Sequence, residues 1–154
     1  MSIPNSLKSI LGSWRATNRL WLAPGVPLHE SAATAKVTSA AQGRFLNIAY
    51  TWDEAGPQDG LLLIGQDSQS DQVSAGWVDS WHNGDRLMSC VGFLTAEGAF
   101  SVKGAYPAPP GPDWGWQIVV TPESGEETWS LTMYNITPEG EVFLAVEAVF
   151  SRQT

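Results

Sequence analysis

The sequence predicts an all-β fold, an antiparallel up-and-down β-barrel of about ten strands behind a short N-terminal helix. Runs rich in Val, Ile, Thr and aromatic residues are separated by clusters of the turn-forming residues Gly, Pro, Asn and Asp. Apolar and polar side chains alternate within several runs, which is typical of strands with one buried face. The short connections favour antiparallel neighbours, and closing the sheet removes its two exposed edges. The alternative architecture, a two-layer sandwich, has longer and less regular connections.

The N-terminal segment is the only part of the chain whose pattern indicates a helix. The predicted helix runs from Pro4 to Leu11, and Ser2 is its candidate cap. Leu7, Ile10 and Leu11 fall on one face at helical spacing.

A single domain over residues 1–154 is expected, with residues 1–11 as a helix or lid and residues 12–152 as the barrel. The predicted strands are 12–22, 30–39, 43–52, 59–67, 72–82, 85–94, 98–106, 114–121, 126–136 and 140–152. The dipeptide Asn83-Gly84 is typical of a tight hairpin turn, because both residue types tolerate a positive φ.

The charge of the chain argues against several classes of partner. Lys and Arg number 8 and Asp and Glu number 16, so the net charge is −8, and the basic residues are scattered. Nucleic-acid binding needs a concentrated basic surface, and an anionic membrane repels an acidic chain, so we expect neither partner. The sequence has no apolar run of 18 residues and no pattern of a secretory signal. We therefore predict a cytoplasmic protein without membrane insertion.

Cysteine and histidine usage indicates neither a disulfide nor a metal site. Cys90 is the only cysteine and lies in an apolar run, which favours a small buried side chain over a reactive thiol. His29, in a predicted loop, and His82, at a predicted turn edge, are expected to be exposed. They are far apart in sequence, and no cysteine cluster accompanies them, so no metal is expected. Haem would need an axial histidine, which the last two predicted strands lack, and we expect no cofactor.

Alternation along the strands selects the side chains that point into the barrel. The inward residues chosen as candidate ligand contacts are Asn18, Arg44, Tyr50, Trp77, Asp79, Trp81, Trp116, Trp129, Met133 and Asn135. Aromatic and apolar groups with a few polar ones are typical of a small-molecule pocket, so we predict a hydrophobic or amphipathic ligand in the lumen. In the alternative interpretation, Arg44 and Asp79 pair with each other or with the backbone inside a filled barrel. Trp21 is expected to point outward.

The two ends of the barrel sequence carry residues that can meet. Gly12-Ser13-Trp14 lies where the helix enters the first strand, and Arg152 ends the last strand. A guanidinium group stacks well on an indole face. The pair resembles the closure of lipocalins and calycins, in which an arginine of the last strand packs over a tryptophan of the first. This resemblance implies that Trp14 and Arg152 close the base of the barrel.

Further motifs follow one another across about residues 10–152. They are Gly65-Gln66-Asp67, Gly76-Trp77-Val78-Asp79-Ser80, Met133-Tyr134-Asn135-Ile136 and Phe150-Ser151-Arg152. In this order they resemble the DUF1579 family of small bacterial proteins with a lipocalin-like barrel and no assigned function. The resemblance implies the fold and a bacterial origin, but no activity. Gln66 and Asn135 depart from the family, which usually has tyrosine at the first position and often glutamate at the second.

Two alternatives to a ligand-binding barrel stay open. No residue is assigned as catalytic, but Asp79 is a candidate acid or base for a calycin-type enzyme, because the flanking Trp77 and Trp81 would raise its pKa unless Arg44 compensates. The other alternative is a non-catalytic module that packs its outer face on a partner or forms a homodimer. It is suggested by the predicted strands 59–67 and 140–152, which are apolar on both faces.

Overall fold

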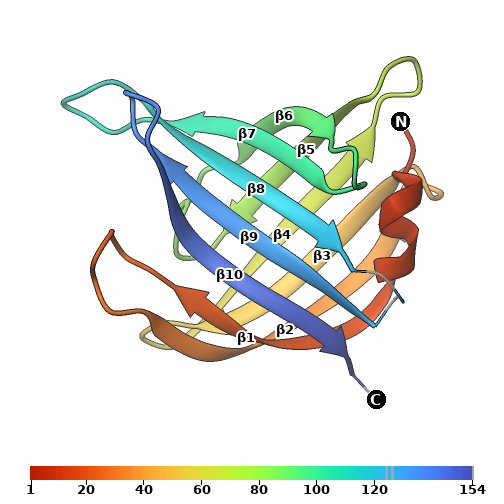
Figure 1. Ribbon diagram of the computed structural model, residues 1–154, viewed down its shortest axis with the longest axis horizontal. Helices are drawn as coiled ribbons and strands as arrows, with labels where there is room; N and C mark the ends of the chain where they lie inside the picture. Colours follow the sequence, from red (N-terminus) through yellow and green to blue (C-terminus); the bar gives the residue numbers. More distant parts are fainter. Residues whose placement is uncertain (124, 126, 154) are drawn as a thin grey trace.

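The computed structural model describes residues 1–123, 125 and 127–153 as a closed antiparallel barrel of ten strands (Figure 1). A 3-10 helix, η1 (Asn5–Ile10), precedes them. The strands are β1 (Gly12–Leu20), β2 (His29–Ala40), β3 (Phe45–Asp53), β4 (Pro57–Gln66), β5 (Gln72–Asp79), β6 (Met88–Leu94), β7 (Phe100–Tyr106), β8 (Trp114–Pro122), β9 (Thr128–Ile136) and β10 (Val142–Arg152). Each strand pairs with its neighbours in the chain, and β1 pairs with β10 to close the sheet. The predicted up-and-down barrel is confirmed.

The N-terminal helix differs in type from the prediction. Ser2 makes no cap; its backbone N–H and C=O pair instead with those of Gln66, at N···O distances of 2.9 and 2.7 Å. Of the residues on the predicted apolar face, Leu7 and Ile10 are buried, whereas Leu11 is exposed. The short red helix lies across one end of the barrel in Figure 1, which we call the base. No helix in the described part of the chain has the length and apolar character needed to cross a bilayer.

Most strand ends differ from the predictions by one to three residues, but the β5–β6 connection differs more. β5 stops at Asp79, and an eight-residue loop, Ser80–Leu87, replaces the predicted two-residue turn at Asn83-Gly84. The Asp79 carboxylate accepts the backbone N–H groups of Trp81 and His82, at 2.9 and 2.8 Å. These bonds fold the chain into a turn, so the strand ends early. Glu126, where the ninth strand was expected to start, lies outside the described residues.

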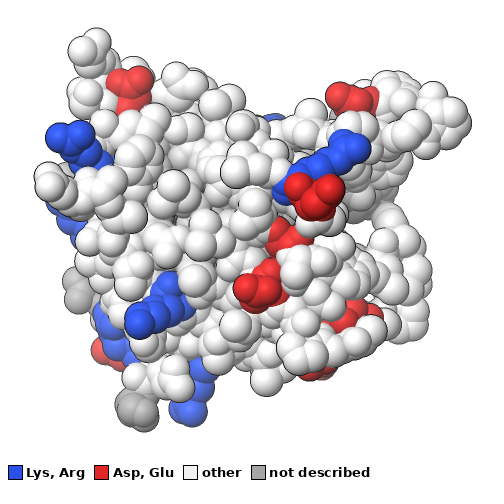
Figure 2. Space-filling model, turned by 180° about the vertical axis from the view of Figure 1, so that it is seen from behind, with Lys and Arg blue, Asp and Glu red and all other residues white. Residues whose placement is uncertain are grey.

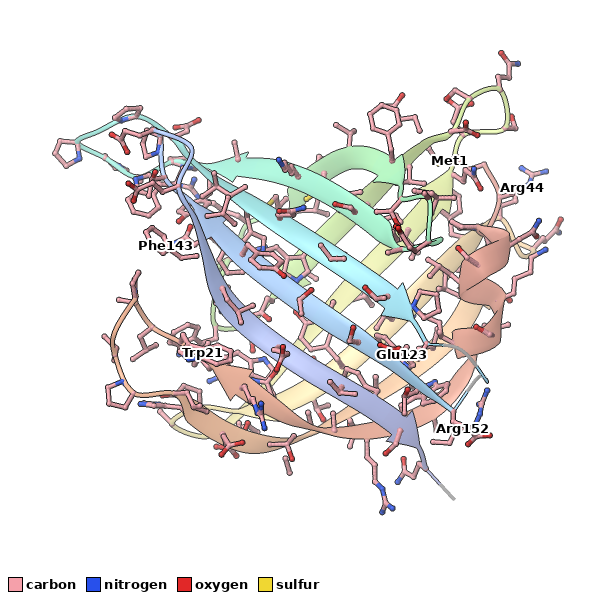
Figure 3. All side chains as sticks on the ribbon, viewed as in Figure 1. Met1, Trp21, Arg44, Glu123, Phe143 and Arg152 are labelled. Atoms are coloured by element: carbon pink, nitrogen blue, oxygen red, sulfur yellow. The ribbon has the colours of Figure 1, made fainter. Side chains whose placement is uncertain are left out.

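The period-two alternation places the predicted core correctly along most strands. In β3 the side chains of Leu46, Ile48, Tyr50 and Trp52 are buried, and intervening residues are more exposed. Arg44 departs from this pattern. It lies exposed in the turn before β3, at the same end as the helix (Figure 3), so its predicted inward orientation is wrong. The alternation begins only where the ladder begins, and residues 41–44 form a turn.

Candidate functional site

The base of the barrel is closed by side chains from both ends of the chain. Trp14 is fully buried, and its indole N–H donates to the Ile10 carbonyl oxygen at 2.7 Å. The Arg152 guanidinium carbon lies 4.3 Å from the centre of the Trp14 ring. Arg152 also donates to the carbonyl oxygens of Ser9 and Leu11, at 3.1 and 3.2 Å. The guanidinium thus joins the helix to the last strand across the indole face.

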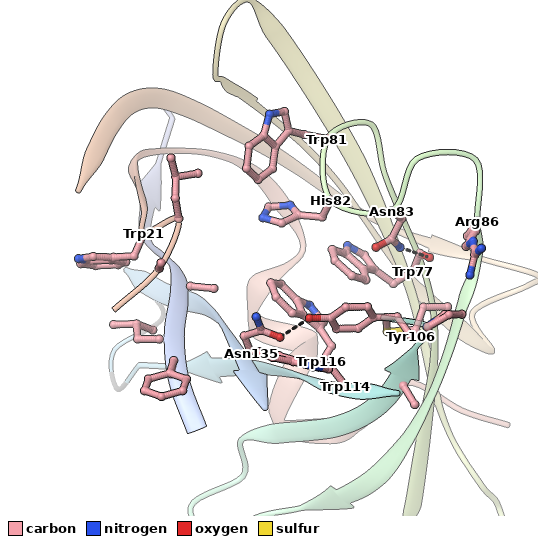
Figure 4. Close-up of a pocket in the computed structure, with 18 of the residues that line it drawn as sticks. Trp21, Trp77, Trp81, His82, Asn83, Arg86, Tyr106, Trp114, Trp116 and Asn135 are labelled. Atoms are coloured by element: carbon pink, nitrogen blue, oxygen red, sulfur yellow. Dashed lines mark hydrogen bonds between the residues drawn. The ribbon is translucent and has the colours of Figure 1, made fainter. Parts of the chain in front are cut away.

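The opposite end of the barrel is open and holds a cavity of about 780 Å³ (Figure 4). Phe143 and Trp21 mark this end in Figure 3, across the barrel from Arg44. The aromatic residues that line the cavity are Trp21, Trp77, Trp81, Tyr106, Trp114, Trp116 and Phe143. The polar residues that line it are His82, Asn83, Arg86 and Asn135. This volume and this mixture of aromatic and sparse polar groups are typical of sites for small organic molecules.

Aromatic rings in the cavity wall pack against one another in stacked and edge-to-face contacts. The rings of Trp77 and Trp116 stack with centroids 5.4 Å apart and an interplanar angle of 7°. The His82 ring lies 5.4 Å from Trp52 in a stacked arrangement and 4.8 Å from Trp81 edge to face. The imidazole is therefore fixed among indoles, and its side chain is only 12% exposed.

A hydrogen-bonded cluster of polar side chains lies behind this wall. The Asp79 carboxylate accepts the Tyr50 hydroxyl at 2.6 Å, and its other oxygen lies 3.1 Å from His82 Nδ1. The Trp77 indole N–H donates to the Tyr50 hydroxyl oxygen at 2.8 Å. With the backbone N–H groups of Trp81 and His82, the carboxylate has partners for both oxygens. Such a network fixes the rotamers of its members.

The titration behaviour of Asp79 is opposite to the sequence prediction. Burial raises its pKa, but the hydrogen bond and positive charge of His82, together with the Tyr50 hydroxyl, outweigh burial and leave the pKa below its ordinary value. Burial, followed by the nearby Asp79 charge, raises the pKa of Tyr50 well above its ordinary value. Asp79 is thus a stable anion that orients its neighbours, and the predicted raised pKa is wrong.

The structure divides the ten predicted contact residues among four places. Trp77, Trp81, Trp116 and Asn135 line the cavity. Asn18, Tyr50, Asp79 and Met133 surround an internal gap of only about 10 Å³ beneath it. Trp129 lies at the base, edge-on to Trp14 at 6.1 Å and stacked on Phe150 at 4.4 Å. Arg44 is exposed outside the barrel, and no hydrogen bond or ion pair joins it to Asp79.

Several residues that line the cavity were not predicted from the sequence to do so. His82 was expected to be exposed at a turn, but the Ser80–Leu87 loop folds its ring into the cavity. Trp21 was expected to point outward, yet it lines the cavity because β1 ends at Leu20 and its backbone N–H bonds to Ala145 O at 2.9 Å. The aspartate three residues before His82 was a usable signal, because such residues often cap turns.

Metal-binding chemistry has little support in the described residues, which contain no group of three or more His, Cys, Asp or Glu side chains suited to one ion. His29, the other histidine, begins β2 rather than lying in a loop. It is exposed as expected, with its Nδ1 3.1 Å from the Glu54 carboxylate.

Solved structures share this fold at low sequence identity. "Crystal Structure of Rv2717c from M. tuberculosis" matches with a TM-score of 0.64 and 13% identity, covering 99% of this chain and 100% of that one. "Structure of S-type Phycobiliprotein Lyase CPES from Guillardia theta" matches with a TM-score of 0.65 and 12% identity, covering 100% and 94%. At these identities the similarity establishes the fold alone. No curated protein matches the chain significantly.

The match to a family model extends over nearly the whole chain, not only over the short motifs. The sequence pattern of DUF1579, described as "Protein of unknown function", matches residues 4–152. That range includes the base closure, the cavity and the Asp79 cluster. The chain therefore belongs to the DUF1579 family.

Proposed function

We propose that this protein binds a small, largely apolar aromatic molecule in the cavity at the open end of its barrel. The observation that carries the proposal is the size and lining of that cavity, about 780 Å³ bounded mainly by aromatic rings. Burial of apolar ligand surface contributes about 25 cal/mol per Å², so burial of about 200 Å² contributes about 5 kcal/mol before the costs of association. The aromatic wall supports stacking as well as burial.

The polar residues of the lining give a bound molecule an orientation. Asn135 accepts the Tyr106 hydroxyl at its side-chain oxygen, so its amide position is fixed. Arg86 supplies a positive charge in the Ser80–Leu87 loop, where it suits an acidic group on an amphipathic ligand. Asn18, Tyr50, Asp79 and Met133 act from beneath the cavity by supporting its wall. Arg44 and Trp129 have no part in the proposed site.

Titration with an amphipathic aromatic probe tests the proposal. We expect 1-anilinonaphthalene-8-sulfonate to bind the folded protein with a defined stoichiometry and to gain fluorescence. Trp81→Ala should weaken binding, because this indole lines the cavity. Phe93→Ala is the matched control, since Phe93 is an exposed aromatic on the outer face. Equal loss in both variants, or no binding by the wild type, would contradict the proposal. Native mass spectrometry of freshly purified protein extends the search to retained ligands.

A homodimer is a second candidate, favoured by apolar residues on the outer barrel surface. Phe93 and Val91 on β6 are 65% and 54% exposed, and Leu61, Leu63 and Val78 add apolar area on β4 and β5. Seen from behind, much of the barrel surface carries no charge (Figure 2). A sedimentation experiment in which Phe93→Lys abolishes a dimer would support this interface, whereas a wild-type monomer would contradict it. A bacterial origin and a cytoplasmic location stay predictions.

A further inference from the structure

We propose that His82 selects the ligand: its Nε2 atom accepts a hydrogen bond, so the cavity prefers flat aromatic molecules that carry an O–H or N–H group. This inference rests on the proposed function, because it concerns the same cavity. It goes further by naming the chemical group that the ligand must present and the atom that receives it.

The first step of the argument is the proton position on the imidazole. His82 Nδ1 lies 3.1 Å from an oxygen of the Asp79 carboxylate, and that oxygen also accepts two backbone N–H groups. A carboxylate can only accept hydrogen bonds, so Nδ1 carries a proton. In a neutral imidazole whose Nδ1 is protonated, Nε2 has a free lone pair. Where His82 is neutral, Asp79 thus makes Nε2 an acceptor.

The second step is the accessibility of Nε2. No side chain or backbone group among the described residues bonds to Nε2. Trp116 Nε1 also lacks a partner, but it is sealed from solvent, whereas His82 Nε2 is not. His82 lines the cavity, and Figure 4 shows its ring extending from the loop into the space between Trp81 and Trp77. A molecule in the cavity therefore meets an acceptor that has no partner in the protein.

The third step is the rigidity of the acceptor. The imidazole is stacked on Trp52 at 26° and meets Trp116 at a centroid distance of 5.3 Å, while Asp79 fixes its other nitrogen. A fixed acceptor cannot turn away when a ligand without a donor group covers it. Sites of this kind discriminate strongly, because a buried polar group left unpaired costs about 1–3 kcal/mol.

The fourth step concerns the shape of the ligand. Trp77 and Trp116 lie within 7° of parallel and are both buried in the wall beside His82. The two indoles are stacked on each other and share one orientation, so a planar ligand that lies parallel to them keeps more contact than a bulky aliphatic one. The preferred class is therefore planar and conjugated, with its donor group directed to His82.

Binding of two matched probes tests the inference. 2-Naphthol and 2-methoxynaphthalene share one ring system, but only the first can donate a hydrogen bond. At about pH 8 we expect wild-type protein to bind 2-naphthol about tenfold more tightly than 2-methoxynaphthalene, as measured by quenching of tryptophan fluorescence. His82→Leu should abolish this preference and retain binding of the methyl ether. His29→Leu, at the exposed histidine outside the cavity, should keep the preference.

The outcomes separate this inference from the proposed function. Equal affinity of the two probes for wild-type protein, or a preference that survives His82→Leu, would overturn the role of His82 and leave the ligand site standing. Failure of both probes to bind would overturn the proposed site as well. If His82→Leu does not fold, the long-range ¹H–¹⁵N spectrum of the wild-type imidazole decides. A proton on Nδ1 and a bare Nε2 support the inference, and a proton on Nε2 at the same pH overturns it.

Discussion

The two ends of this barrel use the same residue types for different purposes. At the base, Trp14 and Trp129 are fully buried; Arg152 and η1 contact Trp14, and Phe150 stacks on Trp129. At the open end, Trp81 is 39% exposed, and Trp77 and Trp116 form a wall beside a cavity of about 780 Å³. A covered indole such as Trp14 contributes to stability, whereas the exposed part of Trp81 beside the cavity is available to a ligand. Trp77 and Trp116 line the same cavity but are themselves buried. Whether a side chain points inward matters less than how deep it lies along the barrel.

The polar groups differ between the ends in the same way. At the base, the Arg152 guanidinium bonds to backbone carbonyl oxygens of the helix and stacks on Trp14. At the open end, Asp79 accepts hydrogen bonds from His82 and Tyr50, and the His82 ring lines the cavity. At the base, Trp14 and Arg152 therefore bond within the protein, although Trp129 Nε1 has no partner there, whereas the acceptor proposed at the open end is kept for another molecule.

The largest expected effect is on stability, and it should occur at the base. Trp14→Ala removes a fully buried ring and should lower the free energy of unfolding by about 3–5 kcal/mol. Trp81→Ala should cost less than about 1 kcal/mol, because its ring is partly exposed. Urea unfolding followed by circular dichroism measures both values. Similar losses in the two variants would break the contrast between the ends.

Asp79→Asn should have an intermediate, pH-dependent effect. The folded-state pKa of Asp79 lies below its ordinary value, so its contribution is fully present above that value, about 3.9, and is lost as the pH falls through the lower folded-state pKa. At neutral pH we expect the substitution to cost about 1–3 kcal/mol. Urea unfolding near pH 7 and near pH 3 should show the cost shrinking with acid. A constant cost would argue that the charge of Asp79 contributes nothing.

Arg152→Ala should destabilise the base less than Trp14→Ala does. The guanidinium stacks on an indole and donates to two carbonyl oxygens, but it is exposed, so we expect a loss of about 1–2 kcal/mol. Arg152→Lys should recover only part of this lost stability, because an ammonium group lacks the planar, forked set of N–H donors of a guanidinium group. Probe affinity at the open end should not change in either folded variant. A large change in affinity would show that the two ends are coupled.

The smallest expected effect is at Cys90, where the reactivity of the thiol measures how accessible the wall just below the cavity is to solvent. Its side chain is buried two residues beyond Met88, which lines the cavity, and burial raises the pKa of the thiol to about 11. Ellman's reagent at neutral pH should therefore leave the native protein unmodified and react after unfolding in urea. Rapid reaction of native protein would indicate that the cavity opens further down the wall.

The sequence predicted the barrel because apolar and polar side chains alternate along its strands and because Gly, Pro, Asn and Asp mark its turns. Leu46, Ile48 and Tyr50 follow this period, and all three are buried. The predicted inward orientation of Arg44 was wrong because this residue lies in a turn, where side chains do not alternate with a period of two. Alternation also separates inside from outside without giving depth, so it grouped Trp129 at the base with Trp116 at the cavity.

Asp79 signals a turn before His82, but the inward position of the His82 ring could not be predicted, because it depends on contacts between distant segments. Its loop is shaped by Asp79, whose carboxylate is in turn held by Tyr50, 29 residues earlier in the chain. Trp52 and Trp116, from β3 and β8, then fix the ring. A turn that contains Asn83-Gly84 is ordinarily exposed, and only this packing makes His82 part of the cavity wall.

The central claim, that the open end receives ligand and the base does not, is tested most directly by the indole N–H signals in a ¹H–¹⁵N spectrum. Assignment by single Trp→Phe substitutions, followed by titration with 2-naphthol, should show shifts for Trp77, Trp81 and Trp116 and constant signals for Trp14 and Trp129. Shifts confined to Trp14 and Trp129, or no saturable shift at any indole, would contradict the account.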